Sequence, residues 1–324
     1  MMRLGIAGCG RITERGYVPA ALAAEGVTLA AFADPDPDRL SHCLGLWREG
    51  GGEAEGFTDL ASLLKAGQID LLVVAAPLGL HVGLAEEAAA AGMRSLVEKP
   101  PAPDRAGAER LAALDPAPLL AFNRRFLHGA ELRDQIPPEG WIELDLELRF
   151  RQQAWGAHEV RDEALLDAGI HLIDLACHLT GAEPIAVRRV KIGPDAASLE
   201  LELSRGRARI SCATDRSHRE AVSVRDRSGK VLARSAWGGL RSRLAGLVGK
   251  PDQLALSLQR QLEALRDAAA DPAFVLWTSI PGKGRTPLAS AADGVAAMAV
   301  VEAARHSAAL GGAEVTVDPV EALT

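Results

Sequence analysis

The stretch RLGIAGCGRIT, residues 3–13, decides the fold. Its apolar beginning predicts a β-strand, and its glycines predict a tight turn that leads into a helix. The free backbone N–H groups at the start of such a helix form a site for the phosphates of a dinucleotide. Gly8 and Gly10 match the first two glycines of the dinucleotide-binding fingerprint, and Thr13 replaces the third. Because two glycines suit many tight turns, a turn without a ligand stays open as an alternative.

An acidic residue ends the next predicted strand, VTLAAFAD, residues 27–34. Asp34 follows the glycines by roughly 20 residues, the offset at which a carboxylate binds the adenosine ribose. A carboxylate there accepts hydrogen bonds from both ribose hydroxyls and repels a 2′-phosphate, which favours NAD over NADP. Arg39 leaves NADP open, and an ordinary Asp-Pro turn is the alternative role for Asp34.

Strands and helices continue to alternate as far as residue 126. IDLLVVAAP, residues 69–77, is a continuous apolar run typical of a buried strand. GLAEEAAAAG predicts a helix that ends at Gly92, and residues 94–100 and 118–126 predict two more strands. This alternation predicts a doubly wound parallel sheet, which binds its ligands at the carboxyl ends of the strands. Those ends are the Gly8 turn, Asp34, residues 75–77, residues 98–100 and residues 123–125.

The second half of the chain alternates strictly between apolar and polar residues. WIELDLELRF, residues 141–150, places apolar and charged side chains on opposite faces, which predicts a half-buried strand. Residues 198–215 and 221–237 each predict a hairpin, so the sheet is expected to be largely antiparallel. A helix over residues 163–181 is expected to cover its apolar face, and an amphipathic helix is predicted over residues 252–270. The charged face is either solvated or an interface between subunits.

The length of 324 residues exceeds what one hydrophobic core usually serves, so two domains are expected. We predict an α/β fold that begins with a Rossmann dinucleotide-binding domain, a doubly wound parallel sheet, over residues 1–122. Residues 123–324 are expected to form an α+β domain with a largely antiparallel open sheet. This second domain is expected to bind substrate and to form oligomers, and its last helix can pack back on the first domain.

The charge and composition argue against several classes of function. The net charge of −7, without a strongly basic segment, disfavours binding to nucleic acid or to anionic membranes. No run of about 18 apolar residues is present, so no transmembrane helix is expected. The four cysteines lack the spacing of metal ligands and fit reduced thiols. Because the N-terminus also lacks the pattern of a signal peptide, the expected location is cytoplasmic.

A polar stripe marks the predicted helix LLDAGIHLID, residues 165–174. Asp167, His171 and Asp174 occur at i, i+4 and i+7, so they share one face of an otherwise apolar helix. A satisfied core histidine is the simplest alternative. Asp174 and His178 have the i, i+4 spacing of a metal pair, but we expect no metal. Support of His171 by Asp174 is the preferred interpretation.

Five segments occur in the order and spacing of the Gfo/Idh/MocA oxidoreductases, the family of glucose–fructose oxidoreductase and inositol dehydrogenase. They are GIAGCGRI, AAPLGLH, LVEKP, AFNRRF and ALLDAGIHLIDL. The tail at residues 293–317 also resembles the last helix and strand of that family. The resemblance covers nearly the whole chain and is most specific at residues 98–100 and at Asp167 with His171.

The resemblance implies that Lys99, Asp167 and His171 are the catalytic residues and meet over the nicotinamide ring. Oxidation of a secondary alcohol needs a base for the O–H proton and a cation for the developing alkoxide, while the hydride goes to the cofactor. Histidine titrates near neutrality, which suits His171 to the proton transfer, and Lys99 can donate to the same oxygen. Asp167 can hold His171 or a substrate hydroxyl. The lysine and the histidine could also exchange the proton duty.

The resemblance further implies which side chains hold the cofactor and the substrate. The residues expected at the cofactor are Gly8, Gly10, Arg11, Ile12, Asp34, Ala76, Pro77, His81, Glu98, Lys99 and Asn123. Those expected at the substrate are Lys99, Arg124, Arg125, Trp155, Asp167 and His171. For each of the two arginines, an ordinary surface role is an equal alternative.

Two positions depart from the family pattern. The family often has a Gly-Gly pair before the ALLD segment, where this chain has Asp162 and Glu163. Added carboxylates would crowd or recharge the pocket, which concerns the substrate more than the reaction. Thr13 is a milder change, since a small residue still lets the helix pack against the strand.

These observations predict an NAD-dependent oxidoreductase, with NADP as the alternative cofactor. The expected substrate is a secondary alcohol or ketone of a polyhydroxylated sugar, cyclitol or sugar derivative, a class that comes mainly from the resemblance. Two alternatives remain: a hydrolase or lyase that retains NAD and oxidises its substrate transiently, and a non-catalytic dinucleotide-binding regulator. Because members of the family commonly associate through the open sheet, a homodimer or homotetramer is expected.

Overall fold

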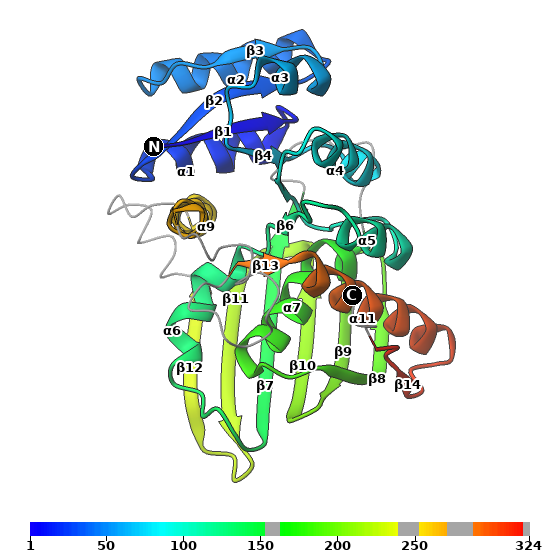
Figure 1. Cartoon of the computed structure of the whole chain (residues 1–324). Coiled ribbons are helices and arrows are strands. Elements are labelled where there is room, and N and C mark those ends of the chain that lie inside the picture. Colours follow the sequence, from blue (N-terminus) through cyan, green and yellow to red (C-terminus); the bar gives the residue numbers. More distant parts are fainter. Residues whose placement is uncertain (153–162, 239–252, 271–287, 320–324) are drawn as a thin grey trace. The chain divides into compact units, whose positions relative to one another are not determined.

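The computed structural model describes residues 1–152, 163–238, 253–270 and 288–319. The chain forms two compact units, each with one seven-stranded sheet (Figure 1). Unit 1 consists of Met1–Phe126 with Asp252–Gly294, and unit 2 consists of Leu127–Pro251 with Val295–Thr324. Neither unit is therefore a single continuous stretch of chain, in contrast to the expected division after residue 122.

The sheet of unit 1 is parallel apart from one edge strand. Its strands are β1 (Met2–Ala7), β2 (Val27–Ala33), β3 (Glu55–Phe57), β4 (Leu71–Val74), β5 (Ser95–Val97), β6 (Leu119–Leu120) and β13 (Ala289–Ser290). Their order is β13-β6-β5-β4-β1-β2-β3, and β13 runs antiparallel to β6. The predicted doubly wound parallel sheet is confirmed. The carboxyl ends of its parallel strands consequently lie along one edge.

Helices follow the strands of this sheet. They are α1 (Val18–Ala23), α2 (Pro37–Glu49), α3 (Leu60–Ala66), α4 (His81–Ala90) and α5 (Arg105–Ala112), with a short 3₁₀ turn, η2 (Leu78–Leu80), before α4. Helices α2, α3 and α5 each begin after an aspartate whose side chain caps the helix. At the start of α2, the Asp36 carboxylate accepts hydrogen bonds from the backbone N–H groups of Asp38 and Arg39. Pro37 occupies the first turn, where its missing N–H is not needed.

Helix α9 (Gln253–Ala269) belongs to unit 1 although it comes late in the sequence. It packs against α1 and against the π-helical turn η1 (Thr13–Tyr17), and Leu258 and Leu262 are fully buried in the core of unit 1. The sequence correctly predicts the helix but places it with the second domain. An amphipathic pattern shows that a helix has one apolar face, and it does not show which element that face covers.

The sheet of unit 2 is largely antiparallel, as predicted. Its strands are β7 (Ile142–Arg151), β8 (Pro184–Ile192), β9 (Ala196–Leu203), β10 (Gly206–Ala213), β11 (Asp215–Asp226), β12 (Val231–Gly238) and β14 (Val315–Thr316). Their order is β12-β11-β7-β10-β9-β8-β14, in which β7 and β10 pair in parallel (Figure 1). The predicted hairpins β9–β10 and β11–β12 are both present. On β7, Ile142, Leu144, Leu146 and Leu148 are buried, as the alternating pattern predicts.

The apolar face of this sheet is covered by the predicted helix, which begins with a π-helical turn. The turn η5 (Leu165–Gly169) packs against β7, β9 and β10, and α7 (Ile170–Thr180) continues it against β7 and β10. Gly181, in the left-handed conformation, ends α7. The remaining described helices of this part of the chain are the π-helical turn η3 (Arg125–Gly129), α6 (Ala130–Arg133) and α11 (Ala291–Ala309).

The described residues bear on two expectations, those for membrane-spanning helices and for the state of the four cysteines. No helix within them is both long enough and apolar enough to cross a bilayer. Cys9, Cys43, Cys177 and Cys212 are all free thiols, and the first two lie together in the core of unit 1.

The placement of α9 predicts that a cavity in this helix destabilises unit 1. We expect Leu262→Ala to lower the free energy of unfolding by about 2–5 kcal/mol, because it removes a fully buried side chain from the core. Leu310→Ala is the matched control, since Leu310 is 55% exposed and should change stability by less than about 0.5 kcal/mol. Urea denaturation of both variants measures the difference, and equal stabilities would contradict the packing of α9.

Candidate functional site

The turn after β1 passes extremely close to the end of β4. Gly8 has a φ of +106°, and a Cβ atom at this position would lie 2.5 Å from the carbonyl oxygen of Ala75. Only glycine combines this backbone conformation with this approach. The Thr13 hydroxyl donates a 2.6 Å hydrogen bond to the carbonyl oxygen of Gly8. The residue that replaces the third fingerprint glycine therefore closes the turn.

Gly10 presents open backbone at the beginning of the first helix. A Cβ atom built on Gly10 would meet no atom within 4 Å, in contrast to Gly8. The chain turns helical immediately after Gly10, so the first N–H groups of a helix face this space. Arg11 is exposed and pairs with Glu14 at 2.8 Å, and the partly buried Ile12 packs against the core of unit 1. The arrangement can accept a pyrophosphate at the Gly10 backbone.

The carboxylate of Asp34 is buried and held in one orientation at the end of β2. One oxygen accepts a 2.7 Å hydrogen bond from the backbone N–H of Cys9, and the other accepts one of 2.9 Å from that of Asp36. Arg39 lies 3.3 Å from the second oxygen, and its side chain is 55% exposed. The structure thus brings Asp34 beside the glycine turn, as predicted for a ribose-binding acid.

His81 joins two loops at the sheet edge through its ring. Nδ1 lies 2.8 Å from the carbonyl oxygen of Pro100, and Nε2 lies 2.8 Å from that of Ala76. Because carbonyl oxygens only accept hydrogen bonds, both contacts are hydrogen bonds only when the ring carries both protons. His81 is only 2% exposed, and its two contacts support the loops that contain Ala76, Pro77 and Lys99.

Glu98 is a buried acid immediately before the candidate catalytic lysine. Its Oε1 atom accepts a 2.7 Å hydrogen bond from the Tyr17 hydroxyl, and its Oε2 atom accepts one of 3.0 Å from the backbone N–H of Lys99. Burial raises the pKa of Glu98, and the hydrogen bond from Tyr17 and the charges of Lys99 and Arg124 oppose that rise. Burial and the neighbouring carboxylate raise the pKa of Tyr17. Tyr17 is not predictable as a site residue from the sequence, since its contact with Glu98 depends on the fold.

Residues 123–125, which follow β6 (Leu119–Leu120) after Ala121 and Phe122, have different surroundings. Within the part of the chain that the structure describes, Asn123 has a buried Oδ1 atom without a hydrogen-bond partner. An amide oxygen in this state fits a donor on a bound molecule. Arg125 is buried, and its guanidinium contacts the carbonyl oxygen of Leu288 and the carboxylate of Asp293, each at 3.3 Å. Arg124 is only partly buried, which makes it the better of the two candidates for a substrate contact.

In unit 2, the polar residues Asp167, His171 and Asp174 lie on a helix that begins with a π-helical turn, so their relative positions differ from those on a regular α-helix. Asp167 lies within the π-helical turn η5, whereas His171 and Asp174 lie on α7 and are buried. The Gln152 side chain donates a 3.2 Å hydrogen bond to Asp167. The wider π turn shifts Asp167 relative to His171 from the simple i, i+4 relation, and such turns are frequent at functional sites.

Asp174 and His178 are the residues with metal-pair spacing, and His178 has a cationic neighbour. Arg133 lies 3.3 Å from Nδ1 of His178, an unfavourable neighbour for a cation. The described residues contain no group of three or more His, Cys, Asp or Glu side chains that could hold a metal ion.

One departure from the family pattern is explained by an ion pair. Glu163 pairs with Arg305 of α11, whose Nε atom lies 2.6 Å from a Glu163 oxygen. The Glu163 carboxylate is therefore neutralised by a partner within unit 2. Asp162 and Trp155 lie outside the described residues.

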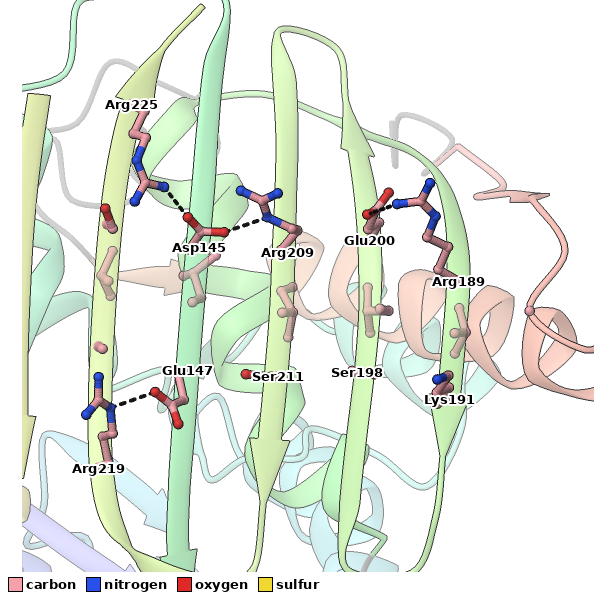
Figure 2. A pocket seen from close by; sticks show the side chains of 18 of the residues that line it. Asp145, Glu147, Arg189, Lys191, Ser198, Glu200, Arg209, Ser211, Arg219 and Arg225 are labelled. Carbon is pink, nitrogen blue, oxygen red and sulfur yellow. Dashed lines mark hydrogen bonds and ion pairs between the residues drawn. The ribbon is translucent and has the colours of Figure 1, made fainter. Parts of the chain in front are cut away.

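A separate concavity of about 930 Å³ lies on the charged face of the sheet in unit 2. Figure 2 shows side chains that line it. Asp145 lies between Arg209 and Arg225, Glu147 pairs with Arg219, and Glu200 pairs with Arg189. None of the residues predicted for the cofactor or the substrate lines it. This concavity therefore belongs to the open sheet and not to the candidate active site.

Comparison with known proteins identifies the family. The model of the oxidoreductase family with an NAD-binding Rossmann fold, Gfo/Idh/MocA, matches residues 2–116. The rhizopine catabolism protein MocA of Rhizobium meliloti is 30% identical over 326 residues, which cover 93% of this chain and 93% of that protein. The chain belongs to the Gfo/Idh/MocA family. It is an oxidoreductase whose N-terminal Rossmann sheet binds NAD, and the Gly8 turn, the open Gly10 backbone and the Asn123 oxygen fit that cofactor.

Other members are similar over different lengths. A dTDP-3,4-didehydro-2,6-dideoxy-α-D-glucose 3-reductase of Streptomyces antibioticus is 30% identical over 204 residues, which span 56% of this chain and 58% of that enzyme. The crystal structure of myo-inositol dehydrogenase from Lactobacillus casei, in complex with NAD(H) and myo-inositol, has a TM-score of 0.76 at 17% identity. The likeness covers 100% of this chain and 99% of that one, and it shows a shared fold.

Substitution of each glycine of the turn by alanine should affect a different property: stability at Gly8 and cofactor binding at Gly10. Gly8→Ala should lower the free energy of unfolding by about 1–3 kcal/mol, because of its positive φ and the approach to Ala75. Gly10→Ala should keep stability within about 0.5 kcal/mol but weaken NADH binding about tenfold or more, since its methyl group enters the phosphate space.

Fluorescence titration with NADH and thermal denaturation measure the two effects. Gly83→Ala is the control, because Gly83 also faces open space but lies on α4. Unchanged NADH affinity in Gly10→Ala would contradict the assignment of the phosphate site.

Proposed function

We propose that this chain transfers a hydride between NAD and a secondary alcohol or ketone of a sugar, cyclitol or sugar derivative. The observation that carries the proposal is the open Gly10 backbone beside the buried Asp34 carboxylate, in a chain of this family. The names of its relatives support the substrate class: they include a D-apiose dehydrogenase of Paraburkholderia graminis and an inositol 2-dehydrogenase of Leifsonia xyli. A polyhydroxylated substrate is common to both names.

Three side chains are proposed to carry the chemistry. NAD, held at the Gly10 backbone and by Asp34, would supply the nicotinamide as the hydride acceptor. The Lys99 ammonium donates a hydrogen bond to the substrate oxygen and stabilises the negative charge that develops there. The imidazole of His171 removes the proton from that oxygen. Asp167, which Gln152 orients through its amide, binds the imidazole or a neighbouring hydroxyl.

The preference for NAD over NADP is proposed from the state of Asp34. Its carboxylate is held by two backbone N–H groups and is 6% exposed, so a 2′-phosphate would be placed against a fixed negative charge. Arg39 offsets part of this charge from one side. NADP is therefore expected to bind more weakly but measurably.

Removal of the proposed catalytic groups separates chemistry from cofactor binding. We expect Lys99→Ala and His171→Ala each to lower kcat by about 10²–10⁴-fold, because each removes a group that acts on the substrate oxygen. NADH affinity should change much less. Nicotinamide absorbance at 340 nm, recorded with a panel of cyclitols, aldoses and ketoses, measures the turnover. Lys65→Ala, on the surface helix α3, is the control and should keep full activity.

Full activity in the double variant would contradict these roles. A cofactor that stays bound without exchange, with bond cleavage instead of net NADH formation, would favour the NAD-retaining hydrolase or lyase.

We also propose that the open sheet forms the interface of a homodimer or homotetramer. Its polar face carries alternating acidic and basic side chains, and such a face can pair with its own copy about a twofold axis (Figure 2). We propose a cytoplasmic location from the scattered free thiols.

Charge reversal on this face tests the interface. Arg209→Glu replaces the guanidinium that lies 2.6 Å from the Asp145 carboxylate with a second carboxylate. The repulsion on this face should shift the protein towards the monomer. Sedimentation velocity measures the change, with Arg48→Glu on α2 as the control. A wild-type monomer at all concentrations would contradict the proposal.

A further inference from the structure

One helical turn makes hydrogen bonds at its two ends, one to the cofactor turn and one to the loop of the candidate catalytic lysine. Thr13 and Tyr17 are the first and last residues of the π-helical turn η1, and both are fully buried. Thr13 bonds to the Gly8 carbonyl, and Tyr17 donates to Glu98 at 2.7 Å. Glu98 in turn accepts a hydrogen bond from the backbone N–H of Lys99 at 3.0 Å. One turn of helix thus holds both the phosphate-binding turn and the lysine loop.

The carboxylate of Glu98 depends on these donors for its charge. It is 5% exposed, so water contributes little to its solvation. Four groups favour its charged form: the Tyr17 hydroxyl, the Lys99 N–H, and the cationic side chains of Lys99 and Arg124. Tyr17 is the donor whose ring is wholly enclosed by the core and whose hydroxyl is aimed at one oxygen. Loss of this hydroxyl would leave burial to raise the pKa of Glu98 further.

The ionisation of Glu98 matters for the backbone of Lys99. A carboxylate accepts a shorter and stronger hydrogen bond from an N–H group than a neutral carboxyl does. The preceding backbone N–H, that of Glu98 itself, bonds to the Val74 carbonyl oxygen at 2.9 Å and belongs to the sheet. The Lys99 N–H is the first one past the sheet, and the following residues, Pro100 and Pro101, have no N–H.

We propose that Tyr17 is a positioning residue: its hydroxyl fixes one oxygen of the buried Glu98 side chain, so that the other oxygen holds the peptide of Lys99 in place. The inference rests on the proposed function, because Lys99 is the candidate catalytic cation. It adds to that function a residue from the cofactor-binding helix. Tyr17 acts through Glu98 and touches neither the substrate nor the cofactor.

Amide hydrogen exchange tests the positioning without any substrate. In Tyr17→Phe, the Lys99 amide should exchange about tenfold faster relative to the amide of residue 98, because only the former depends on the carboxylate. Glu98→Gln should do the same. Val18→Ala, a buried neighbour of Tyr17 on α1, is the control for general loosening and should leave this ratio unchanged.

The pH dependence of catalysis supplies a second readout, once a substrate has been found. Glu98 is active as the carboxylate, so activity is lost as the pH falls through its pKa. Without the Tyr17 hydroxyl that pKa is higher, and the acidic limb of kcat/KM should move towards higher pH in Tyr17→Phe. The same limb should disappear in Glu98→Gln.

The single tyrosine of the chain gives a direct control of the contact. Absorbance at 295 nm reports only Tyr17 ionisation, which should begin at lower pH in Glu98→Gln than in the wild type because the neighbouring charge is gone. An unchanged exchange ratio in Tyr17→Phe, despite a lowered melting temperature, would reduce Tyr17 to core packing and overturn the proposal. Absence of turnover with every polyol, with the exchange ratio raised, would contradict the proposed function alone.

Discussion

The close approach of the Gly8 turn to the end of β4 is the constraint on which the rest of the candidate site depends. A side chain at residue 8 would overlap the Ala75 carbonyl, so the backbone itself lies where two parallel strands end side by side. This brings the first N–H groups of the following helix to the sheet edge. Because β2 and β5 pair with these same two strands, Asp34 and Glu98 arrive at the same edge.

Polar groups at this edge are buried, and the structure satisfies them with other parts of the chain. Asp34 is held by backbone N–H groups, His81 by two carbonyl oxygens, and Glu98 by Tyr17 and Lys99. A buried polar group without a partner costs about 1–3 kcal/mol, so each of these contacts limits how the loops can move. Loops held in this way present the cofactor with a prearranged surface.

The strand ends and their acids could be predicted from the sequence, since apolar runs alternate with helices and parallel strands share one carboxyl edge. The roles of individual side chains at that edge could not. The sequence spacing predicts that His81 and Arg125 lie near the site. Only the fold shows that two carbonyl oxygens contact the His81 ring and that Asp293 pairs with Arg125. The π-helical turn around Asp167 and the contact of Tyr17 with Glu98 depend on tertiary packing, which periodicity does not encode. For the same reason, the partner of α9 became clear only in the folded chain.

The measurement that tests the dinucleotide site most directly is native mass spectrometry of the freshly purified protein, followed by fluorescence titration with NADH and NADPH. A site built from the Gly8 turn, Gly10 and Asp34 predicts reversible NADH binding with a dissociation constant on the order of micromolar, and weaker binding of NADPH. Binding of neither nucleotide would contradict the assignment of this edge as the cofactor site, and with it the catalytic roles proposed for Lys99 and His171.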